Sequence, residues 1–215
     1  IEADYEPHDC VVDLAGALEP GAVEVWPDLA PGNLCFDWQM GNKPETNAAF
    51  ETAEEIVEIE IVNNRLVPNA MEPRGALGTY HAHDGSYVIE CNNQGAHTVR
   101  DTFAAVLGIP NNKLRVITPD VGGGFGMKAV PYAEQALVLL ASKAVGKPVK
   151  WRQDRSEAFL TDAHGRDHVT VARMAINADN HFTGLQVRTI AGLGAYLSAA
   201  GPIICTLLYA KALPG

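Results

Sequence analysis

The residues best suited to chemistry lie in one short stretch, Asp120-Val121-Gly122-Gly123-Gly124-Phe125-Gly126-Met127-Lys128. Four glycines in five positions leave a backbone that other groups can approach closely, because glycine has no Cβ and adopts positive φ without penalty. Phe125 is the one large ring among them. A strand is expected before this loop and a helix after it, which is a usual position for a ligand-contacting loop. The composition predicts either a loop that lies against a ligand or a tight turn.

Two common phosphate-binding motifs do not fit this loop. A Walker loop needs a glycine, four residues and then Gly-Lys-Ser/Thr, but Met127 stands where the second glycine belongs and Ala129 where the hydroxyl belongs. A dinucleotide motif G-x-G-x-x-G counted from Gly122 also ends at Met127. Nucleotide binding through this loop is therefore disfavoured, and a titration with nucleotides would test it.

Side chains that could bind metals or transfer protons are scattered along the chain. No two of the four cysteines form a C-x-x-C pair, so zinc and iron–sulfur sites are not predicted in this stretch. Such cysteines are typical of reduced, largely buried thiols in a cytoplasmic protein. His97 and the group His164, Asp167 and His168 could bind a metal or act as a base, or they could be hydrogen-bonded structural residues.

Five stretches, in order along the chain, resemble the large subunit of the molybdenum hydroxylases. That family includes xanthine dehydrogenase, aldehyde oxidase and aerobic carbon monoxide dehydrogenase. The glycine loop resembles the family's signature loop. The other stretches are Asn69-Ala70-Met71-Glu72-Pro73-Arg74-Gly75-Ala76, Asn92-Asn93-Gln94-Gly95-Ala96-His97, Gly146-Lys147-Pro148-Val149-Lys150-Trp151 and His164-Gly165-Arg166-Asp167-His168.

The resemblance implies a molybdopterin-type molybdenum cofactor, with or without an attached nucleotide. Its dithiolene holds the metal, so no protein metal ligand is expected in this stretch. The family's activity would be the hydroxylation of an aldehyde or N-heterocycle, or the oxidation of carbon monoxide, with a metal-bound hydroxide. Iron–sulfur clusters and FAD would lie on partner chains or domains of an oligomer. The chain is expected to be an internal fragment that is inactive alone, because the family's glutamate base lies beyond Gly215.

Particular residues match the family's site. The resemblance implies that Gln94, which lies 31 positions before Phe125, is catalytic and cofactor-binding, through a hydrogen bond from its amide toward the metal's oxo group. It also implies that Gly123, Gly124, Phe125 and Gly126 contact the cofactor. Considered without the family, Gln94 could be a helix-entry residue bonded to backbone and Phe125 a core residue.

Four further expectations concern charged or missing side chains. Ala129 stands where the xanthine-oxidising branch has a glutamate, so binding of a purine by a carboxylate at that position is not expected. Glu72 and Arg74 are expected to form an ion pair that pins a loop, and Glu134 to be a solvated or capping charge. Arg152, Asp154 and Arg155 are expected to form a charged surface loop.

The alternative function is a non-enzymatic folded module whose glycine loop serves packing or partner docking.

Periodicity predicts the elements that must position these residues. Alternating apolar positions and turn pairs predict strands at 55–61, 87–91, 113–117 and 149–151 and a hairpin of 167–177 with 185–190. The strand at 55–61 is expected to be half-buried. Apolar positions at helical spacing predict helices from about 95 to 107 and over 133–145, each followed by a glycine cap at Gly108 or Gly146. Helices mixed with hairpins indicate an α+β fold.

Composition sets limits on the organisation of the chain. Its 215 residues are 47% apolar, enough for a sizeable core, and no apolar run approaches the roughly 18–20 residues that cross a membrane. A net charge of −10 disfavours nucleic acid as a partner. Residues 1–47, rich in proline and glycine, are expected to be a linker and the tail of a preceding domain, with brief strands at 10–12 and 22–25. Residues 48–215 are expected to be the first, incomplete part of the molybdopterin-binding domain.

Overall fold

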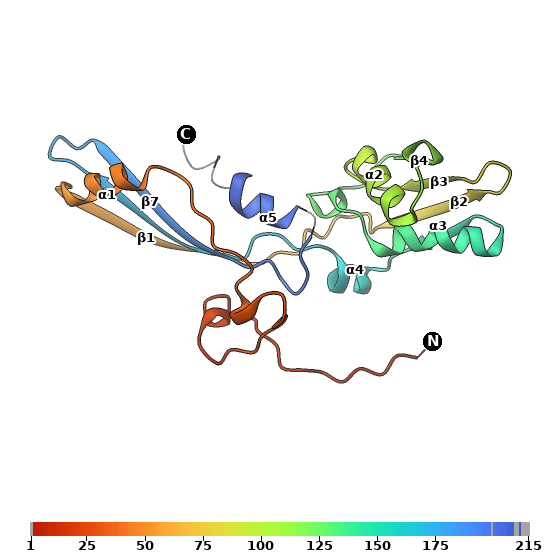
Figure 1. The fold of residues 1–215 in the computed structure, drawn as a ribbon, viewed down its shortest axis with the longest axis horizontal. Coiled ribbons are helices and arrows are strands. Elements are labelled where there is room, and N and C mark those ends of the chain that lie inside the picture. Colours follow the sequence, from red (N-terminus) through yellow and green to blue (C-terminus); the bar gives the residue numbers. More distant parts are fainter. Residues whose placement is uncertain (1, 199, 209–210, 212–215) are drawn as a thin grey trace. The chain divides into compact units, whose positions relative to one another are not determined.

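The computed structural model describes residues 2–198, 200–208 and 211. The chain forms two compact units, one of residues 66–165 and one of residues 1–65 with 166–215. Each unit combines an antiparallel or mixed sheet with helices, so the α+β prediction is confirmed (Figure 1). None of the described helices is both long enough and apolar enough to span a membrane.

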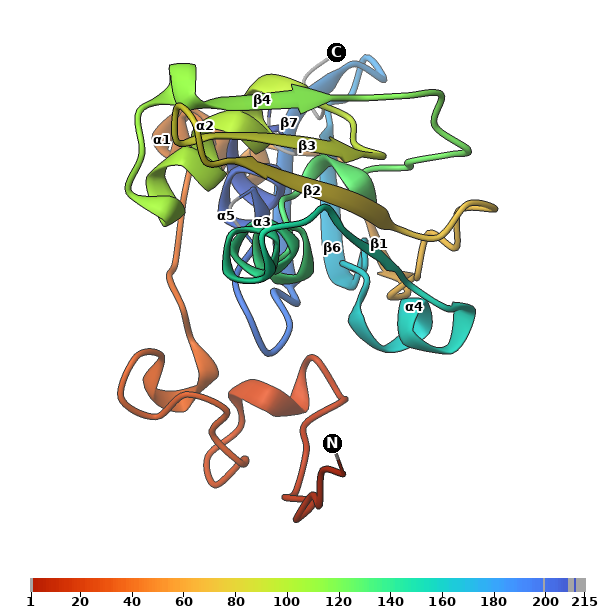
Figure 2. The same cartoon turned by 90° about the vertical axis from the view of Figure 1, so that its right-hand side faces the viewer.

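The unit of residues 66–165 is built on a four-stranded sheet in the order β4-β3-β2-β5, of which β4, β3 and β2 run side by side in Figure 2. Strand β2 is antiparallel to both β3 and β5, whereas β3 and β4 are parallel. The strands are β2 (Gly75–His81), β3 (Ser86–Cys91), β4 (Leu114–Ile117) and β5 (Val149–Arg152). The helices are α2 (Ala96–Leu107), α3 (Ala133–Val145) and α4 (Arg155–Thr161), with 3-10 turns η3 (Asn111–Lys113) and η4 (Met127–Ala129).

The core of this unit lies between the sheet and the helices α2 and α3. Ile89 and Leu114 from the sheet pack with Phe103 of α2 and Leu139 of α3. Helix α3 comes so close to β2 that a Cβ added at Gly78 would lie 2.7 Å from the backbone oxygen of Val138. Burial of these side chains removes apolar surface from water, which is the main stabilising term of such a unit.

The predicted helices are confirmed, together with their glycine caps. Helix α3 covers the predicted residues 133–145, and α2 begins at Ala96 within the predicted range. Gly108 and Gly146 follow the two helices with φ values of 65° and 67°. This left-handed conformation ends a helix and is accessible to glycine at low cost.

The parallel pairing of β3 and β4 decides where the candidate site lies. Helix α2 is the crossover between them, as a parallel pair requires. Because the two strands run in the same direction, the segments that follow them leave the sheet at the same edge. Gln94 follows β3 and the glycine loop follows β4, so the topology brings them to one edge.

The other unit contains the antiparallel sheet β1-β6-β7. Its strands are β1 (Glu55–Asn63), β6 (His168–Ile176) and β7 (Phe182–Ala191), and the predicted β6–β7 hairpin is confirmed. Helix α1 (Lys43–Glu51) packs on β7, where a Cβ added at Gly184 would lie 3.0 Å from the Cβ of Ala49. The unit also contains η1 (Gly16–Leu18), η2 (Pro31–Asn33), α5 (Gly201–Ile203) and η5 (Ile204–Leu208).

Several local predictions were wrong or incomplete. The brief strands expected at 10–12 and 22–25 do not form, and the N–H of Val25 bonds to the side chain of Asn33 instead. Helices α1 and α4 and strand β2 were not predicted. Strand β1 is not half-buried: Ile59 on one face is 55% exposed and Val62 on the other is 63% exposed, because β1 is an edge strand and α1 packs on β7.

The proposed division of the chain at residue 47 stays a prediction. Residue 47 falls within α1, whose first turn is capped by Asn42 and carries Pro44. Proline at the start of a helix is a helix-initiation signal, because the first N–H groups have no intrahelical acceptor. This signal could have moved the expected boundary toward the N-terminus.

Candidate functional site

Gln94 lies against the glycine loop. Its Oε1 accepts a hydrogen bond from the N–H of Gly126 at 3.0 Å, and its own N–H donates to the carbonyl of Lys128 at 3.0 Å. A Cβ added at Gly124 would lie 2.5 Å from the side-chain carbon Cδ of Gln94. Gln94 therefore contacts the two glycines on either side of Phe125.

The hydrogen bond from Gly126 determines how the Gln94 amide is oriented. A backbone N–H can only donate, so the Gln94 oxygen must face Gly126 and the NH₂ group must face away. Among the described residues, that NH₂ group has no hydrogen-bond partner, and the side chain is exposed. The amide thus presents an unused donor at the edge of the loop. Gln94 does not cap α2, which has no side-chain cap hydrogen bond; before the helix, the Oδ1 of Asn93 accepts from the N–H of Gly95 at 2.9 Å.

Phe125 is not a core residue, so that alternative is wrong. Its side chain is 74% exposed and its φ is 54°, a left-handed value that is uncommon for a bulky residue. Gly123 has φ of 95°, and a Cβ there would lie 3.0 Å from the Phe125 ring and 3.3 Å from the Cβ of Ala70. A left-handed conformation costs on the order of 1 kcal/mol and occurs preferentially at ligand contacts. The described residues therefore leave most of this ring uncovered, on a backbone conformation that is uncommon for a bulky residue.

An ion pair that the sequence analysis missed holds the start of the loop. Glu72 Oε2 accepts hydrogen bonds from the Nζ of Lys128 at 2.9 Å and from the N–H of Gly122 at 2.8 Å. The N–H of Glu72 in turn donates to the carbonyl of Gly122 at 3.1 Å. Lys128 is only 2% exposed although it carries a charge. A buried ammonium group must be paired with a negative charge. The only sequence signal of such a pair was the position of Lys128 at the end of the glycine loop.

The expected pair of Glu72 with Arg74 is therefore wrong. Arg74 is fully buried, and its Nε donates to the Oδ1 of Asp162 at 2.7 Å. Its Nη1 donates to the Oε2 of Glu134 at 3.2 Å, and its Nη2 to the hydroxyl of Thr161 at 3.0 Å. Glu134 is thus an ion-pair partner of Arg74, and it also lies in the first turn of α3, where a capping charge was expected. Only the fold could reveal these partners, because they come from α3 and the end of α4.

The Arg74 network connects to the glycine loop through Tyr132. The Arg74 guanidinium carbon lies 3.6 Å from the centroid of the Tyr132 ring, a cation–π distance. The Tyr132 hydroxyl donates to the carbonyl of Met127 at 2.6 Å and accepts from the N–H of Ala163 at 3.0 Å. Burial raises the pKa of Tyr132, which keeps the phenol a neutral donor. The interior network therefore supports the C-terminal side of the loop.

The expected charged surface loop at 152–155 is in part the start of a helix. Asp154 caps α4 by accepting from the N–H of Glu157 at 2.8 Å. Arg155 donates to the Oδ1 of Asn69 at 2.6 Å and to the carbonyl of Ala70 at 2.7 Å. Since Ala70 lies beneath Gly123, Arg155 supports the loop from a second segment.

The remaining candidate residues are not brought together as a metal site. Among the described residues, no group of three or more His, Cys, Asp and Glu side chains is placed to hold a metal ion. Asp167 forms an ion pair with Arg65 at 2.5 Å. Burial lowers the pKa of His168 at the start of β6, which favours the neutral imidazole. His97 on α2 and His164 after α4 are exposed.

The carboxylate of Glu72 makes the stability of the chain depend on pH. Burial raises the pKa of Glu72, but hydrogen bonds from Lys128, Gly122 and Asn92 together outweigh it and leave the pKa below its ordinary value. The stabilisation is therefore fully present above the ordinary carboxyl pKa and is lost as pH falls through the lowered one. We expect the wild type to lose more free energy of unfolding than Glu72→Gln between pH 7 and pH of about 3.5. Urea denaturation at both pH values measures this, with exposed Glu60→Gln as the control; equal losses in wild type and Glu72→Gln would contradict it.

Comparison with known proteins finds one family over most of the chain. Residues 27–213 match the family model of the molybdopterin cofactor-binding domain. The large chain of carbon monoxide dehydrogenase from Hydrogenophaga pseudoflava is 32% identical over 213 residues, covering 94% of this chain and 26% of that protein. The large subunit of nicotine 6-hydroxylase from Paenarthrobacter nicotinovorans is 34% identical over 152 residues, covering 71% of this chain and 19% of that protein.

A solved structure gives the same result. The CO dehydrogenase from Oligotropha carboxidovorans superposes with a TM-score of 0.81 at 29% identity, over 88% of this chain and 25% of that chain. The chain therefore spans about a quarter of the length of these carbon monoxide dehydrogenase relatives.

Proposed function

Because this chain belongs to the molybdopterin cofactor-binding domain family, we propose that it is part of the large subunit of a molybdenum hydroxylase. The enzyme would oxidise a small substrate: an aldehyde, an N-heterocycle or carbon monoxide. The similarity to large chains of carbon monoxide dehydrogenase and nicotine 6-hydroxylase supports this range. The observation that carries the proposal is the position of Gln94 against the glycine loop, with its NH₂ donor unused among the described residues.

The residues at this loop fit a molybdopterin-type cofactor. We propose that Gln94, Gly123, Gly124, Phe125 and Gly126 contact it. A methyl group added at Gly123 would meet the ring of Phe125, and one added at Gly124 would meet the side chain of Gln94. The surrounding side chains therefore leave no room for residues larger than glycine at these two positions. When bound, the cofactor supplies the two-electron and oxygen-transfer chemistry that amino-acid side chains lack.

In this proposal, the residues at the loop orient the cofactor and shield it from water. Gln94 holds a neutral hydrogen-bond donor that does not titrate, so its contact does not change with pH. Phe125 covers one side with an apolar ring, which excludes water and strengthens nearby electrostatic interactions. Glu72 and Lys128 hold Gly122 and the end of the loop in place, so that little reorganisation is needed on binding.

We also propose the setting of this subunit. The rest of the large subunit and chains carrying iron–sulfur clusters and FAD would complete an oligomeric enzyme, since the relatives are named as large chains or subunits. All four cysteines are free, which supports a reducing, cytoplasmic compartment, although only Cys91 is buried as expected, whereas Cys10 and Cys35 are exposed.

Metal and pterin analysis of the full-length protein tests the proposed function. We expect about one molybdenum atom per large subunit and a fluorescent oxidised pterin after extraction. A correctly folded protein, expressed with molybdenum and a cofactor supply, that contains neither would overturn the proposal and favour a non-enzymatic module. The exposed Phe125 argues only against the form of that module in which the loop serves internal packing, because such a loop would bury its one large ring. Molybdenum and pterin content distinguishes the cofactor site from a loop that serves partner docking.

Gln94→Glu separates the donor role of Gln94 from its contact with the loop. The variant keeps an acceptor oxygen for the N–H of Gly126 but loses the NH₂ donor and gains a charge. We expect turnover in the holoenzyme to fall about 10- to 100-fold while molybdenum content stays unchanged. Steady-state kinetics with metal analysis checks this, and exposed Gln186→Glu is the control. Unchanged turnover in Gln94→Glu would rule out the donor role.

A further inference from the structure

Asn93, the residue before Gln94, is a buried polar residue whose amide is bonded on both sides. It is only 4% exposed. Its Nδ2 donates to the carbonyl of Cys91 at 3.0 Å and to the hydroxyl of Thr118 at 2.8 Å, and its Oδ1 accepts from the N–H of Gly95 at 2.9 Å. A neutral amide supplies two donors and an acceptor at once. Both of its N–H donors are therefore used inside the unit.

The bond to Thr118 joins the ends of two parallel strands. Asn93 lies two residues beyond β3, and Thr118 directly follows β4. The last backbone pair of these strands is Glu90 with Ile117. The side-chain bond thus extends the connection past the point where backbone pairing stops. It fixes the separation of the two segments that lead to Gln94 and to the glycine loop.

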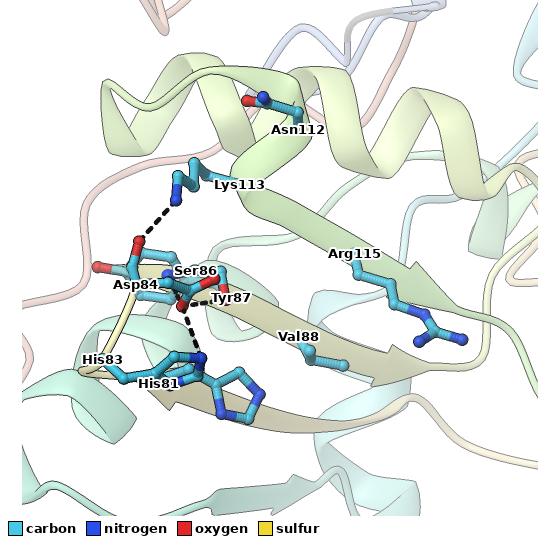
Figure 3. Close-up of a pocket in the computed structure, with 9 residues that line it drawn as sticks. All are labelled: His81, His83, Asp84, Ser86, Tyr87, Val88, Asn112, Lys113 and Arg115. Atoms are coloured by element: carbon cyan, nitrogen blue, oxygen red, sulfur yellow. Dashed lines mark hydrogen bonds and ion pairs between the residues drawn. The ribbon is translucent and has the colours of Figure 1, made fainter.

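At the other ends of β3 and β4, an exposed bond joins the same two strands. The Nζ of Lys113, just before β4, donates to the carbonyl of Asp84, which precedes β3, at 2.6 Å (Figure 3). Both residues line a shallow surface pocket of about 350 Å³. Water can take the place of a bond lost at that surface, whereas a buried amide or its partners would stay unpaired. The bonds of Asn93 are therefore the more costly ones to lose.

Gln94 depends on this support because its own side chain is exposed. Among the described residues, its amide has one hydrogen bond, from the N–H of Gly126 at 3.0 Å. Water competes for an exposed bond, so one such bond holds the side chain weakly. Asn93 bonds to backbone atoms of Cys91 and Gly95, which lie on either side of Gln94. These bonds hold the backbone from which the Gln94 side chain extends toward the loop.

We propose that Asn93 is a positioning residue for Gln94, with Thr118 as its partner across the two strands. Asn93 acts through the Gln94 amide and does not itself touch the cofactor. The inference rests on the proposed function, because the turnover it affects is that of the proposed molybdenum hydroxylase. A residue that only stabilised the unit would lower stability without changing how Gln94 is held.

Ser142 provides a control for such a purely stabilising residue. It is 1% exposed, and its hydroxyl accepts from the N–H of Tyr80 at 2.9 Å. Tyr80 pairs with Tyr87 near the start of β3, whereas Asn93 follows the end of that strand. Ser142→Ala therefore leaves a buried donor unpaired in the same unit, but away from the glycine loop.

Hydrogen–deuterium exchange of the full-length large subunit, followed by mass spectrometry, tests the geometry without relying on activity. In the peptides that contain Gln94 and Gly126, we expect Asn93→Ala to speed exchange at least about tenfold and Thr118→Val about threefold. Thr118→Ser keeps the hydroxyl and is expected to exchange as the wild type, as is Ser142→Ala in these two peptides. Unchanged exchange in Asn93→Ala, or an equal change in Ser142→Ala, would overturn the inference.

Turnover of the holoenzyme tests whether Asn93 acts through Gln94. Asn93→Ala is expected to lower turnover about tenfold with unchanged molybdenum content, but less than about twofold when Gln94→Ala is already present, because residues that act through one another are not additive. An equal loss in both backgrounds would show that Asn93 acts independently of Gln94. If Asn93→Ala does not fold by circular dichroism, Thr118→Val takes its place in both measurements, with Thr118→Ser restoring wild-type behaviour. A Thr118→Val variant that exchanges and turns over as the wild type then overturns the inference.

Molybdenum content, measured on the same samples, separates this inference from the proposed function. Normal molybdenum with unchanged exchange and turnover in the variants sinks the positioning role alone. Absence of molybdenum and pterin from the wild type overturns the proposed function, whereas the exchange measurement still decides whether Asn93 holds Gln94 against the loop.

Discussion

Replacing Arg74 by methionine is expected to lower the free energy of unfolding by about 3–5 kcal/mol. Arg74 and Asp162 are both fully buried and joined at 2.7 Å, so loss of the guanidinium leaves a carboxylate in the interior without a counter-ion. Asp162 already has one oxygen, Oδ2, with no hydrogen-bond partner. Urea denaturation followed by tryptophan fluorescence measures this loss, and one of the reporting rings, Trp151, lies 5.3 Å from the Arg74 guanidinium.

Three companion variants make the Arg74 prediction specific. Arg100→Met, which breaks a partly exposed pair with Asp101, is expected to cost less than about 1 kcal/mol. Arg74→Lys keeps the charge but loses the planar fork that binds Asp162, Glu134 and Thr161, so it should remain clearly destabilised. Arg74→Met/Asp162→Leu removes both charges and should recover part of the loss. A cost for Arg74→Met no greater than for Arg100→Met would contradict the buried network.

Alanine substitutions at Gly122 and Gly124 are expected to have different effects on the candidate site. At Gly122 the new Cβ would lie 2.6 Å from the Cβ of Glu72, an atom tied to its backbone, so one of the two segments must move. That movement disrupts the reciprocal bonds between Glu72 and Gly122. We expect molybdenum content of the holoenzyme to fall at least about tenfold.

At Gly124 the obstacle is a flexible side chain instead of a backbone-linked atom. The new Cβ would lie 2.5 Å from the Cδ of Gln94, which can rotate away. We therefore expect Gly124→Ala to retain molybdenum but to lose turnover, as Gln94→Glu does. Gly165→Ala is the control, because its Cβ would meet no atom within 4 Å. Metal analysis and kinetics on the same preparations compare the three, and equal behaviour of Gly122→Ala and Gly165→Ala would contradict the geometry.

Local patterns were sufficient for the elements whose stability depends on neighbours in sequence. The spacing of apolar residues and a terminal glycine located α3 over 133–145, because a helix buries one face at a period of 3.6 residues. Strand β2 was not predicted, because Gly75 and Gly78 weaken its strand pattern. Gly78 is explained only by the close approach of α3, which the structure shows. The exposure of β1 could not be predicted either, because alternation of apolar and polar residues does not show whether another element covers the strand.

By itself, the sequence determined the family, the glycine loop and Gln94 as the candidate residues, because these depend on residue type and order along the chain. Only the tertiary structure decided that Glu72 pairs with Lys128, that Arg74 pairs with Asp162 and Glu134, and that the Gln94 amide presents its NH₂ group. These partners are separated by 32 to 88 positions in the chain. A charged or polar side chain takes whichever partner folding brings within hydrogen-bond distance, and that partner is set by strand pairing and helix packing rather than by nearness in sequence.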